Sequence, residues 1–136
     1  MDVKQLNGIA LAYAGDAIYE VYIRDFLLQS GRTRSNILHK MATFYVSAKA
    51  QAELTQKLLD QDLLSEEEVS FYRRGRNAKF HTKAKNTDHH TYSISTGFES
   101  LLGYLHLTKQ KERLEELIAW CIEEVGEVHV KEWKKK

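Results

Sequence analysis

The chain has 136 residues, and none of them is proline. Proline ends or kinks helices and interrupts the interior of sheets, so its absence allows long uninterrupted elements. Apolar residues recur at helical spacing along most of the chain, and no short stretch alternates convincingly as a strand. We see no internal repeat. The sequence therefore predicts an all-α fold.

The size and composition are those of one ordinary globular domain. Hydrophobic residues make up 43% and charged residues 29% of the chain, which is not a disordered composition. The single Cys121 rules out an internal disulfide framework, and we interpret it as a core thiol in a reducing compartment. No apolar run approaches the roughly 20 residues that span a bilayer, and the first residues lack a signal-peptide pattern. We expect a cytoplasmic protein without a membrane partner.

Periodicity predicts about six helices, over residues 6–28, 34–45, 47–60, 65–76, 93–106 and 109–125. The first should bury an apolar stripe at spacings of three, four or seven, made of Leu6, Ala10, Tyr13, Ala17, Val21 and Leu28. The second should turn inward Ile37, Leu38, Met41 and Phe44 or Tyr45.

The sequence marks some ends of the predicted helices more clearly than others. Ser65 and Glu68 form a capping-box sequence, which marks the start of the fourth helix. Residues 77–92 lack a sustained period and are expected to form a long loop, a kind of segment that is usually functional or mobile. We expect one domain over residues 1–125 and a charged tail over 126–136.

Two of the predicted helices each carry one acid among small and apolar residues. Asp16 lies within the segment 12–17, and Glu99 lies within 95–103. Burying an ionised carboxylate costs several kcal/mol unless the group is paired or binds a metal. Small residues let helices approach closely, so we expect the two acids to meet at a Mg²⁺ site, since this cation takes one or two protein carboxylates. The alternative for Asp16 is an exposed or salt-bridged acid, and the alternative for Glu99 is an acid favoured near the start of its helix by the helix dipole.

Two more polar residues are candidates for supporting this pair. Glu20 lies one turn after Asp16, and Thr96 lies one turn before Glu99 on the same predicted face. A purely structural role for Glu20 is the favoured alternative.

A basic segment follows the fourth helix. Residues 73–90 hold six Lys and Arg side chains and one Asp, for a local charge near +5. Such a concentration suits contact with a phosphate backbone and would make binding salt-sensitive. The candidate RNA-binding residues are Arg73, Arg74, Arg76, Asn77, Lys79, Lys83 and Lys85. A solvated loop is the alternative, and the spacing of His81, His89 and His90 does not suit zinc.

These motifs together resemble the catalytic domain of ribonuclease III, and most closely the short bacterial form of that family, mini-ribonuclease III. Gly-Asp-Ala at 15–17, followed by Glu20, looks like the leucine-glycine-aspartate-alanine signature. Residues 98–105 are similar to the second acidic motif, and residues 73–79 to a segment typical of the mini form. The resemblance covers residues 6–125, with the three motifs in the expected order.

The departures from full-length ribonuclease III match the mini form. Ala12 and Thr96 stand where the longer enzymes have acids, which leaves Asp16 and Glu99 as the metal pair and the catalytic residues. The separate double-stranded-RNA-binding domain is not expected within 136 residues. The resemblance implies a Mg²⁺-dependent homodimer whose two sites each cut one strand of double-stranded RNA. It also implies a role in maturation of the 23S ribosomal RNA precursor.

Two other functions stay open at this stage. One is a non-catalytic helical module that binds double-stranded RNA through the basic segment. The other is a helical interaction protein without a nucleic-acid partner, against which the local positive charge argues.

Overall fold

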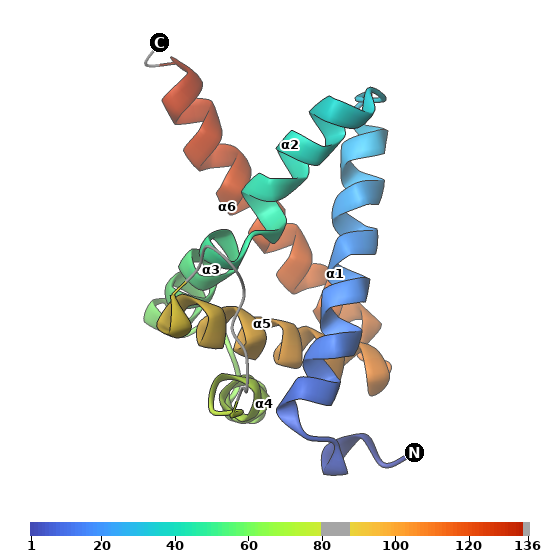
Figure 1. Ribbon diagram of the computed structural model, residues 1–136, viewed down its shortest axis with the longest axis vertical. Helices are drawn as coiled ribbons and strands as arrows, with labels where there is room; N and C mark the ends of the chain where they lie inside the picture. The colour runs from blue at the N-terminus through green and yellow to red at the C-terminus, as the bar shows by residue number, and fades with distance from the viewer. Residues whose placement is uncertain (80–87, 135–136) are drawn as a thin grey trace.

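The computed structural model describes residues 1–79 and 88–134, with side chains described as far as residue 126 (Figure 1). His81, Lys83 and Lys85 of the basic segment therefore lie outside the described residues. A 3-10 turn and six helices follow one another: η1 (Val3–Gln5), α1 (Gly8–Gln29), α2 (Ser35–Val46), α3 (Ala48–Asp60), α4 (Glu66–Arg76), α5 (His89–Leu107) and α6 (Lys111–Lys134). None of the described residues lies in a strand, which confirms the all-α prediction.

Helix α5 forms the centre of the fold, with α1, α3 and α4 packed around it (Figure 1). Most of its residues between Ser93 and Leu105 are buried, although several of them are polar. Carbonyl groups accept hydrogen bonds from these hydroxyls: Thr96 donates to the Tyr92 carbonyl of the same helix at 3.0 Å, and Ser100 donates to the Phe71 carbonyl of α4 at 2.9 Å. Satisfied hydroxyls allow a mixed apolar and polar helix to occupy the core.

Glycines bring the backbones of these helices into direct contact. A Cβ at Gly15 of α1 would lie 1.7 Å from the Glu99 carbonyl oxygen, and a Cβ at Gly103 of α5 would lie 1.9 Å from the Leu11 carbonyl oxygen. On α4, a Cβ at Gly75 would lie 2.7 Å from the Thr96 carbonyl oxygen. No side chain fits in such spaces. The expected close approach of the small helix faces is confirmed.

The predicted buried face of α1 is wrong. Tyr13, Val21 and Leu28, which were expected to face the core, are 85%, 51% and 52% exposed. The buried face is rotated from the predicted one and consists of Gly8, Leu11, Ala12, Gly15, Tyr19, Ile23 and Leu27. Apolar residues occur on nearly every side of this helix, so periodicity alone admits two stripes. The stripe that contains Gly15 is buried because its small residues let α5 pack closely against α1.

Helix α2 is also less buried than predicted. Of its residues only Tyr45 is buried, whereas Ile37 is 40% exposed. In Figure 1, α2 and the C-terminal half of α6 extend beyond the helices that surround α5.

Two predicted boundaries are wrong. Helix α5 begins at His89 rather than 93, because the Asp88 carboxylate accepts from the Thr91 amide at 2.7 Å and caps the helix. Helix α6 continues to Lys134 rather than ending at 125, since nothing in the charged segment breaks a helix. The single Cys121 is buried as predicted, and burial raises the pKa of its thiol.

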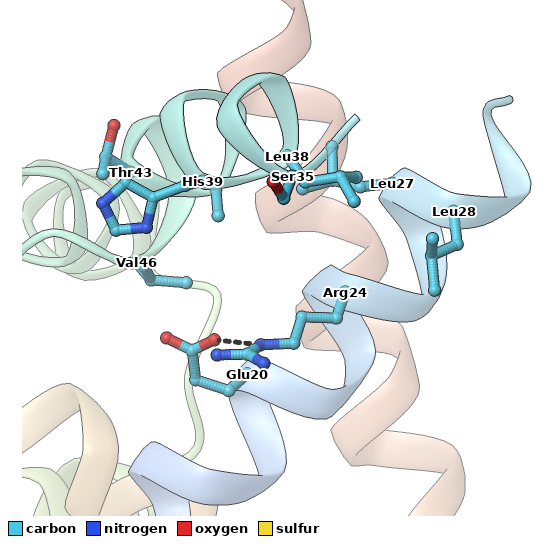
Figure 2. A pocket seen from close by; sticks show the side chains of 10 residues that line it. Glu20, Arg24, Leu27, Leu28, Ser35, Leu38, His39, Thr43 and Val46 are labelled. Carbon is cyan, nitrogen blue, oxygen red and sulfur yellow. Dashed lines mark hydrogen bonds and ion pairs between the residues drawn. The ribbon is translucent and has the colours of Figure 1, made fainter. Parts of the chain in front are cut away.

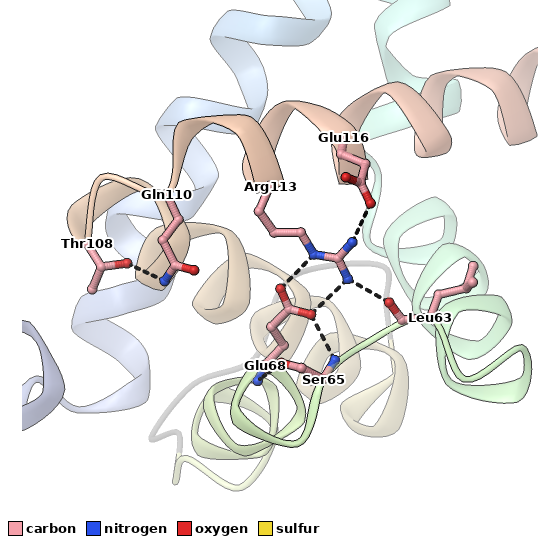
Figure 3. Close-up of polar contacts among 7 residues, drawn as sticks. All are labelled: Leu63, Ser65, Glu68, Thr108, Gln110, Arg113 and Glu116. Atoms are coloured by element: carbon pink, nitrogen blue, oxygen red, sulfur yellow. Dashed lines mark hydrogen bonds and ion pairs between the residues drawn. The ribbon is translucent and has the colours of Figure 1, made fainter.

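An ion pair between the buried Glu68 of α4 and the partly exposed Arg113 of α6 joins the two helices (Figure 3). The capping box is confirmed: Ser65 accepts from the Glu68 amide at 3.1 Å, and Glu68 accepts from the Ser65 amide at 2.9 Å. Arg113 of α6 donates to both carboxylate oxygens of Glu68, at 2.8 and 2.9 Å, and to the Leu63 carbonyl at 2.6 Å. Burial by itself raises the pKa of Glu68, but the hydrogen bonds from Arg113 and Ser65 outweigh burial and hold it below its ordinary value.

Candidate active site

The carboxyl groups of Asp16 and Glu99 converge where α1 crosses α5. Gly15 lies directly against the backbone of Glu99, which brings α1 and α5 into close contact beside Asp16. The two side chains are close enough to share a hydrogen bond. Asp16 is exposed and Glu99 is partly buried. The site is therefore a pair of acids with one side open to solvent.

The environment of Glu99 favours its protonated form. Burial raises the pKa of Glu99 to about 8, and the hydrogen bond and the negative charge of Asp16 raise it in the same direction. A second negative charge beside Asp16 is unfavourable, so Glu99 keeps its proton near neutral pH. A divalent cation would relieve the repulsion and take the place of that proton.

Gln51 of α3 is a third member of the site that the sequence interpretation missed. It is only 2% exposed, and its amide nitrogen lies 3.5 Å from Glu99 Oε2 and 3.3 Å from the Val46 carbonyl oxygen. Gln51 shares the buried face of α3 with Leu54, Thr55 and Leu58. A glutamine at helical spacing within an otherwise apolar stripe was the signal that could have identified it.

The two candidate supporting residues differ in their positions. Glu20 is partly buried and pairs with Arg24 at 2.9 Å, and its charge raises the pKa of Glu99 only weakly compared with Asp16. Thr96 is buried and donates its hydroxyl to the Tyr92 carbonyl, and its own carbonyl faces Gly75 of α4. Thr96 thus belongs to the contact between α4 and α5.

Arg74 of the basic segment is held by the protein itself. Its Nη1 donates to the carbonyl oxygens of Lys4 and Leu6, at 2.6 and 2.9 Å. The guanidinium also lies 4.5 Å from the centroid of the Phe71 ring. These contacts join the N-terminal segment to α4, so Arg74 is better placed to stabilise the fold than to contact a ligand.

The other described basic residues are more accessible. Arg73 and Lys79 are exposed, as is Asn77, which caps the end of α4. Arg76 donates to Asn77 Oδ1 at 3.2 Å and lies 5.5 Å from the centroid of the Tyr72 ring. The end of α4 therefore presents positive charge to solvent.

A groove of about 420 Å³ lies between α1 and α2 (Figure 2). Its walls are mainly apolar and include Leu27, Leu28 and Leu38, and the ion pair of Glu20 with Arg24 borders it. Together with the exposed apolar face of α1, this groove leaves a large apolar area uncovered in the described chain.

Among the described side chains, no group of three or more His, Cys, Asp or Glu is arranged to hold a metal ion. Within the same described residues, no helix combines the length and apolar content needed to cross a lipid bilayer.

The family model and the similar proteins point to one family. The model of the Ribonuclease III domain matches residues 9–110. The chain is 67% identical to the Mini-ribonuclease 3 of Enterococcus faecalis, covering 96% of this chain and 98% of that protein. It is 55% identical to the Mini-ribonuclease 3 of Streptococcus pneumoniae, covering 92% and 98%. A crystal structure of a Fusobacterium nucleatum protein matches with a TM-score of 0.78 at 30% identity, covering 90% of this chain and 96% of that one.

Proposed function

Because the chain belongs to the ribonuclease III family and is an endoribonuclease of its mini form, we propose that it cleaves double-stranded RNA with Mg²⁺ as a homodimer. We further propose that its substrate is the 23S ribosomal RNA precursor, which would place the enzyme in the cytoplasm. The observation that carries the proposal is the convergence of Asp16 and Glu99 at the crossing of α1 and α5.

The donor set fits Mg²⁺. This cation prefers carboxylate oxygens, keeps several waters and is typically held by one or two carboxylates together with substrate phosphate. Asp16 and Glu99 supply two carboxylates, and the open side of the site leaves room for water and phosphate. When bound, the metal would activate water and stabilise the leaving oxygen of a phosphodiester. Asp16 and Glu99 would hold it, and Glu99 would release its proton as the metal binds.

The basic segment is the proposed RNA-binding surface. A-form RNA offers phosphates and 2′-hydroxyls across a shallow minor groove, so recognition should depend mainly on shape and charge. Among the described candidates, Arg73, Arg76, Asn77 and Lys79 lie at the solvent-facing end of α4. Lys83 and Lys85 remain candidates from the sequence alone.

The uncovered apolar face of α1 supports the proposed homodimer. Tyr13 is 85% exposed, and further exposed apolar side chains occur on the same helix at Ile9, Val21 and Leu28. Apolar areas of this kind commonly mark protein interfaces. In a symmetric dimer, each of the two sites would cut one strand of the duplex.

A duplex-cleavage assay tests the proposal. The wild-type protein should cleave double-stranded RNA when Mg²⁺ is present and not in EDTA, because the proposal assigns activation of water and stabilisation of the leaving oxygen to the metal. Asp16→Asn should abolish cleavage and keep duplex binding. Asp60→Asn, an exposed acid at the end of α3, is the matched control and should cleave normally.

Two results would contradict the proposal. Cleavage by Asp16→Asn at the wild-type rate would remove the assigned metal role. Binding of duplex RNA by the wild-type protein without any Mg²⁺-dependent cleavage would favour the non-catalytic RNA-binding module instead.

A further inference from the structure

We propose that Gln51 is a positioning residue that orients the carboxylate of Glu99 for the divalent cation. The inference rests on the proposed metal role of Asp16 and Glu99. It assigns a function to a buried polar side chain that the resemblance to the family does not single out.

The placement of Gln51 is the first argument. At 2% exposure, its amide is removed from water, and burying an amide is costly unless its polar atoms have partners. Its nitrogen lies 3.3 Å from the carbonyl oxygen of Val46, the last residue of α2, and 3.5 Å from Glu99 Oε2. An amide nitrogen carries two N–H donors, so one can be anchored at the end of α2 while the other faces Glu99.

Because one N–H of the Gln51 amide is anchored at Val46, the other N–H points toward Glu99 in a fixed direction. Carbonyls in the last turn of a helix have no partner within that helix, so the Val46 carbonyl is available to Gln51. Gln51 also lies on the face of α3 that packs in the core with Leu54 and Leu58. Glutamine is a flexible side chain, but burial and the Val46 contact restrict its rotamers. The donor is therefore held in place before a metal arrives.

The chemistry of the donor is the second argument. A glutamate side chain has several rotatable bonds, and a metal ligand must be fixed in one orientation. A hydrogen bond at Oε2 limits this freedom and leaves Oε1 available to the cation. Because the amide is neutral, it orients the carboxylate without cancelling the negative charge that attracts the metal. A lysine or arginine at this position would compete with the cation.

A purely structural role is the competing explanation. In that case Gln51 would only donate a hydrogen bond to the free Val46 carbonyl at the end of α2. Its loss would then change the stability of the fold without changing metal affinity. Metal binding measured on the protein without RNA separates the two roles, because it does not depend on catalysis.

The test uses Gln51→Met, which keeps the length of the side chain and removes both donors. Binding of Mn²⁺, used as a paramagnetic stand-in for Mg²⁺, is measured by electron paramagnetic resonance on the RNA-free protein. We expect an affinity about ten-fold weaker than wild type, the size usual for losing a partner of a metal ligand. The Mg²⁺ concentration for half-maximal cleavage should rise by a similar factor. Gln56→Met, on the exposed face of the same helix, should match wild type.

Gln51→Asn is the second variant, in case the methionine variant does not fold. It keeps the amide but is one methylene too short to reach both partners, so it should also weaken Mn²⁺ binding. Folded variants that bind Mn²⁺ as tightly as wild type would overturn the role of Gln51.

Asp16→Asn in the same experiment separates the two proposals. If wild type and Asp16→Asn bind Mn²⁺ equally, the assignment of Asp16 and Glu99 as metal ligands is wrong, and the role of Gln51 is overturned with it. If Asp16→Asn loses binding while the Gln51 variants keep it, only the role of Gln51 is wrong.

Discussion

Replacing Glu99 with glutamine should stabilise the metal-free protein above neutral pH, although the same change should abolish cleavage. The pKa of Glu99 in the folded protein is about 8, mainly because of burial and then because of Asp16. In the unfolded chain this group has an ordinary pKa near 4.5. Between these values the folded protein holds a proton that the unfolded chain has released. The contribution of Glu99 to stability is therefore complete below about pH 4.5 and is lost as the pH rises toward 8.

The size of the effect follows from one proton. A difference of one bound proton changes the free energy of unfolding by about 1.4 kcal/mol per pH unit. Between pH 5.5 and 7.5 the loss would reach about 2.7 kcal/mol, and the solvent contact of Glu99 reduces it to roughly 2 kcal/mol. For a chain of this length, that corresponds to about 6–8 °C in Tm. Glutamine does not titrate, so the variant should escape this loss.

Thermal unfolding by circular dichroism in EDTA at pH 5.5, 6.5 and 7.5 measures the effect. The difference in Tm between Glu99→Gln and wild type should grow with pH, and subtracting wild type cancels the other titrating groups. Glu53→Gln, an exposed acid on α3, should follow wild type at every pH. A difference that stays constant over this range would refute the reasoning. Added Mg²⁺ should stabilise wild type more than Glu99→Gln.

Three further predictions concern the packing and the charged surface. Gly15→Ala places a methyl group within 1.7 Å of a carbonyl oxygen of α5, so it should lower the free energy of unfolding by about 1–3 kcal/mol and reduce cleavage. Gly126→Ala, with open space around it, should change neither. Chemical denaturation and the cleavage assay measure the two effects. Arg113→Ala removes the cation from the buried Glu68 carboxylate and should cost about 1.5–3 kcal/mol by urea unfolding; a loss under about 0.5 kcal/mol would contradict a stabilising role of this pair. Arg73→Ala should reduce the slope of log binding constant against log salt concentration by about 1 without changing Tm. Arg74→Ala should lower Tm and leave that slope unchanged. The reverse pattern would exchange their roles.

Local sequence patterns were sufficient to predict the helices and the two acids. The absence of proline, helical periodicity and the capping box at Ser65 depend only on residues near one another in the chain. The small residues around Asp16 and Glu99 predicted a close helix crossing for a similar reason, since only small side chains permit it. The roles of these acids in metal binding and catalysis remain predictions.

The same patterns could not decide which side of α1 is buried. Apolar residues surround that helix, and the choice between the stripe of Tyr13 and the stripe of Leu11 depends on what packs against it. The position of Arg74 posed a similar difficulty. Its sequence neighbours are basic, but the carbonyl groups that hold it come from the N-terminal segment, about seventy residues away.

What the sequence by itself determined is the helical architecture and the chemistry available to it, because propensity, capping and charge are properties of neighbouring residues. Only the tertiary structure decided that Gln51 reaches Glu99 and that Glu99 holds a proton near neutral pH. Both depend on distances between α1, α3 and α5. Hydrogen bonds and electrostatic repulsion act over a few ångströms in space, and separation along the chain does not report that distance.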